Sequence, residues 1–250
     1  MATSDQLNFT ALVTGASRGF GRAIAVALHA EGAKVVAVAR NVEQLDSLGD
    51  ALGDALTTVV ADVTDPVVAG TLLEQYRPDT LVLNAGAAPL PRPLQRHTWD
   101  TFTRPWGVDV KQAFHWLREA LLLPLDPGST VVAMSSGAAL AGSPLSGGYA
   151  GAKATIRFIT GYAAEESERA GLAIRFISVL PKLTSATDLG SVAVAAYARR
   201  DGISVEEYLA RFGAGLTADE AGNAAVALVA SPEYIPGAYL LTPAGLSRLG

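Results

Sequence analysis

Three polar side chains near the middle of the chain have the types and spacing for proton transfer. Tyr149 and Lys153 stand four residues apart, and Ser136 lies thirteen positions before the tyrosine. The residues that follow, 150–170, are rich in Ala, Glu, Arg and Ile and predict a long helix. On a helix, positions i and i+4 share one face, so the phenol and the ammonium are expected to point the same way.

A phenol beside an ammonium could act as a general acid and base. A phenol ordinarily has a pKa of about 10, and a cation held beside it favours the phenolate. Ser136 follows the apolar run 130–134, which predicts a strand whose end would present the serine hydroxyl to a substrate oxygen. The Tyr-x-x-x-Lys spacing also occurs by chance on surface helices, so this motif alone leaves a surface role open.

A glycine-rich segment near the N-terminus predicts a phosphate-binding turn. The apolar run 11–14 predicts a strand, residues 22–31 predict a helix closed by Gly32, and between them lies Gly15-Ala16-Ser17-Arg18-Gly19-Phe20-Gly21. Glycines let the backbone turn tightly and approach phosphate oxygens, and a helix N-terminus offers unpaired N–H groups to them. The Gly-x-x-x-Gly-x-Gly spacing departs from the common Gly-x-Gly-x-x-Gly form, so a glycine-rich loop without a ligand stays an alternative.

Strands and helices are predicted to alternate along the rest of the chain. Further strands are predicted at 34–39, 56–61, 80–83, 130–134 and 173–180, with helices at 42–52, 66–75 and 98–122. This alternation predicts an α/β fold, a single Rossmann-type doubly wound parallel sheet with helices on both faces. Polar residues follow the strands and should gather at the carboxyl edge, where such sheets bind ligands: Arg40, Asp62, Asn84 and Ser136.

These motifs together resemble the short-chain dehydrogenase/reductase family in its classical form, from Leu12 to about Thr242. Residues 14–21 are similar to the family's cofactor loop, and Asn84-Ala85-Gly86 is similar to its motif after the fourth strand. Ser136, Tyr149 and Lys153 are similar to its catalytic set in order and spacing. The resemblance implies an NAD(P)-dependent oxidoreductase that transfers a hydride between cofactor and a carbonyl or alcohol, without a metal.

The resemblance also implies a role for each matched residue. Tyr149 would exchange a proton with the substrate oxygen, Lys153 would hold the nicotinamide ribose, and Ser136 would orient the carbonyl. Asp62 would bond the adenine. The implied cofactor-binding set is Gly15, Ser17, Arg18, Gly19, Phe20, Gly21, Arg40, Asp62, Val63, Asn84, Ala85, Gly86, Tyr149, Lys153, Pro181 and Thr184.

Arg40 favours NADP(H) over NAD(H). An acid about 20 residues after the glycines would bind a free ribose hydroxyl, whereas an arginine there accommodates a 2′-phosphate. Arg18 adds a second cation, and arginine makes charge-assisted bonds to phosphate. The alternatives are that Arg40 only caps a strand and that Asp62 is only a turn acid.

The chain departs from the family pattern at two places. The family often has a catalytic asparagine in the helix after the fourth strand, and the matching residue here is Asp109, which cannot donate a hydrogen bond when ionised. The usual Pro-Gly after the sixth strand becomes Pro181-Lys182, while Thr184 is expected to meet the nicotinamide carboxamide. In the same region as Asp109, Pro105 predicts a break or kink of the helix at 104–107.

Composition sets limits on class and partners. The 250 residues, 50% of them hydrophobic, are enough for one well-cored domain over 1–250. With 19 basic and 24 acidic residues, the net charge of −5 argues against a nucleic-acid partner. Met1–Asn8 carries no signal-peptide pattern, and no apolar run reaches about 18 residues, so we expect a cytoplasmic protein. There is no cysteine, and His29, His97 and His115 suggest no metal site.

Substrate choice is expected to reside in residues 183–213, a lid segment between the sixth strand and the last helix. Small and apolar residues near the catalytic trio favour a neutral carbonyl compound: Ala138, Leu140, Ala141, Pro144 and Leu145. The family implies a homodimer or homotetramer packed through helices near 108–122 and 150–170, and the tryptophans are expected in the core or in subunit contacts. Two alternatives stay open: a 3-oxoacyl-thioester reductase and a non-catalytic NADP(H)-binding sensor.

Overall fold

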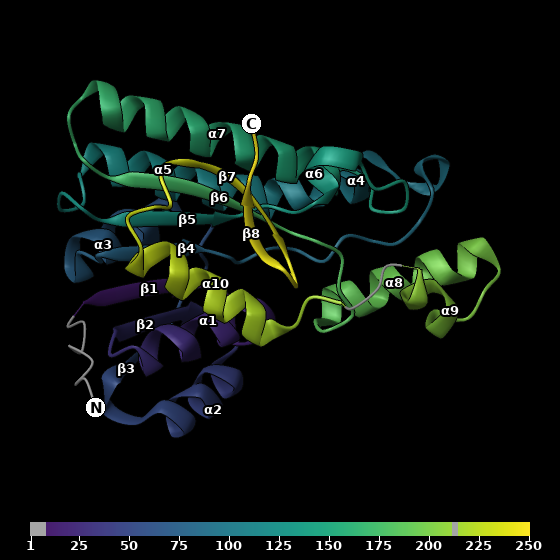
Figure 1. Ribbon diagram of the computed structural model, residues 1–250, viewed down its shortest axis with the longest axis horizontal. Helices are drawn as coiled ribbons and strands as arrows, with labels where there is room; N and C mark the ends of the chain where they lie inside the picture. Colours follow the sequence, from purple (N-terminus) through teal and green to yellow (C-terminus); the bar gives the residue numbers. More distant parts are fainter. Residues whose placement is uncertain (1–8, 212–214) are drawn as a thin grey trace.

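The computed structural model describes residues 9–211 and 215–250. Figure 1 shows one twisted sheet with helices packed against both of its faces. The expectation about a signal peptide concerns Met1–Asn8, and the end of the predicted lid segment includes Phe212 and Gly213. Both lie outside the described residues.

Eight strands form the sheet in the order β3-β2-β1-β4-β5-β6-β7-β8. All neighbours are parallel except β7 and β8. The order runs backwards from β1 to β3 and forwards from β4, so the crevice for a ligand is expected at the carboxyl ends of β1 and β4. The strands are β1 (Thr10–Thr14), β2 (Lys34–Ala39), β3 (Leu56–Val60), β4 (Thr80–Leu83), β5 (Thr130–Met134), β6 (Arg175–Pro181), β7 (Gly237–Thr242) and β8 (Gly245–Arg248).

Ten α-helices are present among the described residues, with two 3-10 turns, η1 (Gly53–Ala55) and η2 (Leu94–Arg96), and one π-helix, η3 (Trp106–Val110). The α-helices are α1 (Gly19–Ala30), α2 (Val42–Leu52), α3 (Pro66–Tyr76), α4 (Trp99–Pro105), α5 (Lys111–Leu122), α6 (Ala138–Ala141), α7 (Tyr149–Arg169), α8 (Asp188–Asp201), α9 (Val205–Ala210) and α10 (Ala218–Ala230).

Each face of the sheet carries its own core. Successive side chains of a strand point to opposite faces, and in β1 Ala11 and Val13 join one core while Leu12 joins the other. The first core includes side chains of α1, α2 and α10, and the second includes side chains of α3, α5 and α7. The predicted doubly wound α/β fold is confirmed.

The expected break in the helix at 104–107 occurs as a change of helix type. α4 ends at Pro105, the π-helix η3 follows, and α5 begins at Lys111. Proline has no N–H to donate, and a π turn is a common way for a helix to accommodate such an irregularity. The wider turn carries Asp109, which is buried at 1% exposure.

The predicted lid segment contains two helices, α8 and α9, where the sequence predicted only a long connection. Figure 1 shows them beside the sheet, beyond the end of α10. Tyr197 of α8 is anchored to the loop before α7, because its hydroxyl lies 2.6 Å from Ser143 Oγ and accepts a hydrogen bond from the backbone N–H of Leu145. None of the helices in the described ranges combines the length and apolar character that crossing a membrane requires.

Candidate active site

The glycine turn between β1 and α1 leaves no room for a side chain at Gly15 or Gly21. Gly15 and Gly19 adopt left-handed backbone angles, with φ of +65° and +56°. A Cβ on Gly21 would lie 2.2 Å from the Gly15 carbonyl oxygen, which only glycine avoids. No side-chain hydrogen bond caps α1 at Arg18, so the first N–H groups of this helix suit a phosphate group. This cradle fits the pyrophosphate of a dinucleotide.

Thr14 joins the glycine turn to the loop after β4. Its hydroxyl donates to the Val82 carbonyl and accepts hydrogen bonds from the N–H groups of Asn84 (2.9 Å) and Ala85 (3.3 Å). The Asn84 side-chain amide donates to the carbonyls of Thr14 and Gly15. The two predicted cofactor segments therefore form one unit. Thr14, the last residue of β1, belongs to the segment 14–21 that resembles the cofactor loop, but no role for its hydroxyl was predicted from the sequence.

Lys153 lies at the centre of the predicted catalytic group. Its Nζ donates to the Met134 carbonyl at 3.0 Å, lies 3.0 Å from Asp109 Oδ2, and stands 5.6 Å from the centroid of the Tyr149 ring. The Lys153 carbonyl accepts a hydrogen bond of 2.7 Å from Ser135 Oγ. The end of β5, the start of α7 and η3 thus meet at one lysine. The Met134 carbonyl and Ser135 were not predicted from sequence.

The ammonium of Lys153 is almost fully buried, with 7% of its side chain exposed. Burial lowers its pKa, but the Asp109 carboxylate and Tyr149 outweigh that effect, and the pKa of Lys153 stands above its ordinary value. Lys153 is therefore a cation at neutral pH. Asp109 is its counter-ion, with a side chain that is 1% exposed.

Ser136 lies at the carboxyl end of β5, two residues after Met134. Its Oγ accepts a hydrogen bond from the N–H of Ala138 at 3.2 Å, and its side chain is half-buried. The next residue, Gly137, donates to the carbonyl of Pro181 at the end of β6. Ser136 therefore occupies the same sheet edge as Lys153, as its position after a strand predicted.

Tyr149 is the first residue of α7, and the residue before it is tightly packed. A Cβ on Gly148 would lie 2.4 Å from the Phe102 carbonyl oxygen. The indole N–H of Trp106 donates to the Gly148 carbonyl at 3.3 Å. Residues of α4 and η3 therefore fix the backbone position from which the Tyr149 side chain extends.

The residues expected to hold the adenosine end lie after β2 and β3. Arg40 is exposed, Val63 is buried, and the Val63 carbonyl accepts a hydrogen bond from the buried indole of Trp116. The backbone N–H of Thr64 donates to Asp62 Oδ1 at 3.0 Å. This bond, helped by the Thr64 side chain and the charge of Arg40, holds the pKa of Asp62 below its ordinary value. Asp62 is therefore an anion at neutral pH.

Two further predicted cofactor residues make side-chain contacts in or near the segment 183–213. Arg18 Nη1 lies 3.1 Å from Oδ2 of Asp188, and Asp188 is the first residue of α8. Thr184 is buried, and its hydroxyl donates to the Leu216 carbonyl and accepts from the N–H of Ala186. Among the remaining predicted residues, Ser17 is 9% exposed and Phe20 packs against the first core.

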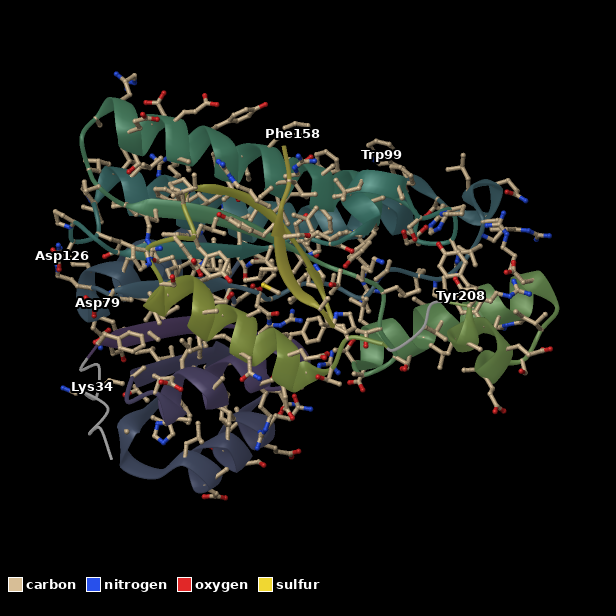
Figure 2. All side chains as sticks on the ribbon, viewed as in Figure 1. Lys34, Asp79, Trp99, Asp126, Phe158 and Tyr208 are labelled. Atoms are coloured by element: carbon tan, nitrogen blue, oxygen red, sulfur yellow. The ribbon has the colours of Figure 1, made fainter. Side chains whose placement is uncertain are left out.

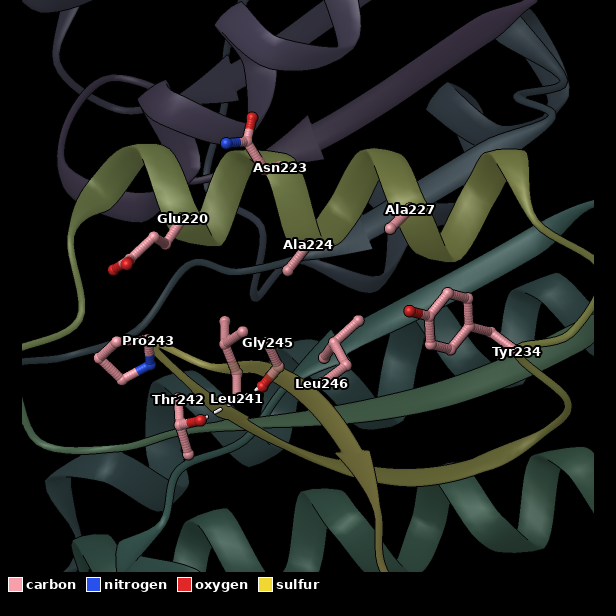
Figure 3. A pocket seen from close by; sticks show the side chains of 10 residues that line it. All are labelled: Glu220, Asn223, Ala224, Ala227, Tyr234, Leu241, Thr242, Pro243, Gly245 and Leu246. Atoms are coloured by element: carbon pink, nitrogen blue, oxygen red, sulfur yellow. Dashed lines mark hydrogen bonds between the residues drawn. The ribbon is translucent and has the colours of Figure 1, made fainter.

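A separate hollow of about 220 Å³ lies between α10 and the β7–β8 hairpin (Figure 3). Its lining is mostly apolar, and its charged side chain, Glu220, accepts a hydrogen bond of 2.6 Å from the N–H of Thr217 at the start of α10. None of the predicted catalytic side chains lines it. Within residues 9–211 and 215–250, no three acidic, histidine or cysteine side chains gather as metal ligands.

Known proteins resemble this chain along most of its length. A family model described as short chain dehydrogenase matches residues 9–197. A 3-oxoacyl-(acyl-carrier-protein) reductase of Rickettsia prowazekii is 30% identical over 68% of this chain and 70% of its own length. The corresponding reductase of Escherichia coli is 46% identical, but that match spans 30% of this chain and 33% of the relative.

Solved structures resemble the fold over nearly the whole chain. A 3-ketoacyl-(acyl-carrier-protein) reductase from Brucella melitensis, complexed with NADH, is 26% identical with a TM-score of 0.75, covering 92% of this chain and 94% of that one. An NAD⁺-bound xylitol dehydrogenase has a TM-score of 0.81 at 21% identity, covering 92% and 95%. The fold, the ordered motifs and these matches lead to one conclusion: the chain belongs to the short-chain dehydrogenase/reductase family and is an NAD(P)-dependent oxidoreductase acting on alcohol or carbonyl groups.

Proposed function

We propose that the chain interconverts a carbonyl compound and an alcohol with NADP(H), and that Tyr149 is the general acid and base. The observation that carries this proposal is the buried Lys153 ammonium, held at the end of β5 within 5.6 Å of the Tyr149 ring centroid. A surface helix with a chance Tyr-x-x-x-Lys spacing would not bury its lysine. This placement supports a functional pair.

Each residue of the chain has a defined task in this reaction. The bound dinucleotide supplies or accepts the hydride. During reduction the Tyr149 hydroxyl donates its proton to the substrate oxygen, and during oxidation the phenolate takes it back. The Ser136 hydroxyl donates a hydrogen bond to the same oxygen, while the Lys153 ammonium would hold a ribose hydroxyl of the cofactor.

The dinucleotide would lie along the carboxyl edge of the sheet. The turn with Gly15, Ser17, Gly19, Phe20 and Gly21 would hold the pyrophosphate, and Arg18 with Arg40 would hold the 2′-phosphate of NADP. Asp62 and Val63 would meet the adenine, and Asn84, Ala85 and Gly86 the adenosine ribose. Pro181 and Thr184 would border the nicotinamide, with Thr184 contributing backbone because its hydroxyl already bonds Leu216.

A substrate panel tests the reaction. Purified protein is given neutral ketones, aldehydes and alcohols with NADPH or NADH, and turnover is followed by nicotinamide absorbance. Tyr149→Phe should lower kcat by a factor of about 10² to 10⁴, the usual contribution of a positioned general acid. Tyr162→Phe is the matched control, because Tyr162 lies on the same helix and is 58% exposed. Equal rates for both variants would remove Tyr149 as the proton donor.

A second variant tests the choice of cofactor. Arg40→Ala should raise the Kd for NADPH by about tenfold or more, because a hydrogen bond to a charged group contributes about 1.5–3 kcal/mol, and should leave the Kd for NADH unchanged. Arg169→Ala serves as the control for loss of one exposed arginine, because Arg169 lies at the end of α7 farthest from Tyr149. A wild-type protein that prefers NADH, with a preference that Arg40→Ala does not change, would refute the NADP assignment.

The curated relatives favour a second candidate, a 3-oxoacyl-thioester reductase, because both relatives described above carry that activity in their names. The panel therefore includes a 3-oxoacyl thioester carried on coenzyme A and on acyl carrier protein. A thioester turned over at least a hundredfold better than any free ketone would select this candidate. The short apolar stretch around α6, with Leu140 46% exposed and Leu145 buried, suits a neutral carbonyl compound better than a highly charged one. Tight NADP(H) binding without turnover of any compound would select a sensor.

The same proposal includes a homo-oligomer and a cytoplasmic location. Large apolar side chains are exposed along α4, α5 and α7, and Figure 2 shows Trp99 and Phe158 on one side of the molecule. Trp99 is 75% exposed, Phe114 52% and Phe158 57%, whereas Trp116 is fully buried in the core. A second copy packed on this face would cover them. Light scattering of the wild type and of Phe158→Glu tests the assembly, and cell fractionation tests the location.

A further inference from the structure

Asp109 stands between two hydrogen-bond donors from separate parts of the chain. Its Oδ1 accepts a hydrogen bond of 2.7 Å from the N–H of Ala87, in the loop after β4. Its Oδ2 lies 3.0 Å from Lys153 Nζ on α7. Oδ2 has no aligned hydrogen bond within the described residues, so the ion pair is the contact that satisfies it. One carboxylate therefore links the predicted cofactor loop to the predicted catalytic lysine.

The loop after β4 is fitted closely around this carboxylate. A Cβ on Gly86 would lie 2.8 Å from Asp109 Oδ2, so the backbone approaches the carboxylate directly. Gln112, three residues later on α5, donates from Nε2 to the Ala85 carbonyl at 3.4 Å. The π turn and the start of α5 thus contact three successive residues of the loop. The position of Asp109 fixes both the loop and the ammonium.

An asparagine could not make both contacts. An ionised carboxylate offers two acceptor oxygens, whereas a side-chain amide offers one acceptor oxygen and one NH₂ donor. With the amide oxygen on the N–H of Ala87, the NH₂ group would face the Lys153 ammonium, which is also a donor. A buried ammonium without a counter-ion is strongly unfavourable.

We propose that Asp109 is a positioning residue that couples the loop Asn84–Ala87 to Lys153, and that this chain requires a carboxylate where its family often has asparagine. The proposal deepens the proposed function and rests on it for its kinetic test. It predicts that Asp109→Asn, the change toward the common family residue, impairs the enzyme.

The charge of Asp109 also affects proton transfer. Among the described residues, the titratable groups that act on Lys153 are Asp109 from η3 and Tyr149 from α7. The end of β5 contributes the Met134 carbonyl to the ammonium, and the Ser135 hydroxyl bonds the Lys153 backbone carbonyl. Removal of a negative charge makes every neighbouring acid lose its proton more easily. The neutral Asp109→Asn variant should therefore have a pH–rate profile displaced toward lower pH. A role limited to packing would not move the profile.

The experiment compares wild type and Asp109→Asn in kcat, the Kd for NADPH and the pH–rate profile. We expect kcat to fall at least tenfold, the Kd to rise several-fold, and the profile to move down by about one pH unit or more. Asp126→Asn is the matched control, because Asp126 also pairs with a cation, Arg77, at 2.6 Å, but on the exposed surface. An Asp109→Asn enzyme with wild-type kcat, Kd and pH profile would overturn the proposal.

A double variant keeps the proposal testable if Asp109→Asn does not fold. Asp109→Asn with Lys153→Met removes both charges, so it should fold and melt above either single variant. If the double variant melts no higher than Asp109→Asn alone, the buried ion pair is not what Asp109 supplies, and the proposal fails. If wild type turns over no compound of the panel, the proposed function fails, but these melting temperatures still decide whether Asp109 and Lys153 act as a pair.

Discussion

Two cation–carboxylate pairs near the predicted cofactor crevice have nearly equal separations, but one pair is buried and the other is exposed to solvent. Lys153 and Asp109 lie 3.0 Å apart with 7% and 1% of their side chains exposed. Arg18 and Asp188 lie 3.1 Å apart with 65% and 79% exposed. The first pair joins η3 to α7 beside the proposed catalytic tyrosine, and the second joins the glycine turn to the start of α8.

The comparison shows that separation alone does not set the strength of an ion pair. Water screens an exposed pair, so its contribution is about 0–1 kcal/mol. Loss of one partner from a buried pair leaves an uncompensated charge and costs about 3–5 kcal/mol. Lys153 is therefore held in a fixed place, whereas Asp188 can be replaced at Arg18 by another anion at little cost.

The largest expected effect comes from removing one cation from each pair. Lys153→Met should lower the free energy of unfolding by about 3–5 kcal/mol, because Asp109 stays buried and charged. Arg18→Met deletes a cation of similar length and should change it by at most about 1 kcal/mol. Denaturant unfolding of the two variants measures both values. Equal losses would mean that burial does not distinguish the pairs.

The stability difference between wild type and Lys153→Met should disappear at alkaline pH. The folded state raises the pKa of Lys153 above its ordinary value of 10.5, so its contribution is fully present below pH 10.5 and is lost as the pH rises through the folded-state pKa. The difference in unfolding free energy between wild type and Lys153→Met should hold constant from pH 7 to about pH 10 and shrink above it. A difference that stays constant or grows as the pH rises above 10.5 would contradict a raised pKa.

Local sequence patterns predicted the elements well, because each element is coded by neighbouring residues. The strands expected at 34–39 and 80–83 have those bounds in the structure, and continuous apolar runs ended by polar residues explain why. The Tyr149–Lys153 spacing predicted a shared helix face, and the two side chains do lie together. The edge that gathers Arg40, Asp62, Asn84 and Ser136 followed from parallel strands alone.

The partners of each charge could not be predicted, because they come from distant parts of the chain. The resemblance located Asp109, but its contact with Lys153 depends on the π turn after Pro105. Arg18 and Asp188 are 170 positions apart, and their contact exists because the fold brings the start of α8 to the glycine turn. Residue spacing carries no information of that kind. The helix α8 was missed because residues 188–201 mix small, apolar and charged residues without a strong helical period.

A smaller effect on stability is expected from the hydrogen bond between Tyr197 and Ser143, which anchors α8 to the loop before α7. Tyr197→Phe removes the hydroxyl that pairs with Ser143 but keeps the ring stacked on Tyr208, with centroids 6.0 Å apart. Loss of a partly buried neutral hydrogen bond should lower the unfolding free energy by about 0.5–1.5 kcal/mol. It should also speed proteolysis within 183–211 more than Arg18→Met does, because the exposed ion pair holds the lid weakly. Slower cleavage of Tyr197→Phe than of Arg18→Met would show that the ion pair is the main anchor.

The smallest effect on stability, and the most specific effect on binding, is expected from Asp188→Asn. The pair is exposed, so the unfolding free energy should change by less than about 1 kcal/mol. If Arg18 binds the 2′-phosphate, that phosphate competes with Asp188, and removal of the carboxylate should tighten NADPH binding up to about fivefold without changing NADH binding. The gain should decline as added salt shortens the screening length. Asp201→Asn is the matched control, since Asp201 also pairs with an arginine of the lid, Arg211, at 3.4 Å. Equal effects of the two variants on the Kd for NADPH, or weaker NADPH binding by Asp188→Asn, would mean that Asp188 does not compete with the phosphate for Arg18. Arg40 would then have to hold the 2′-phosphate without help from Arg18.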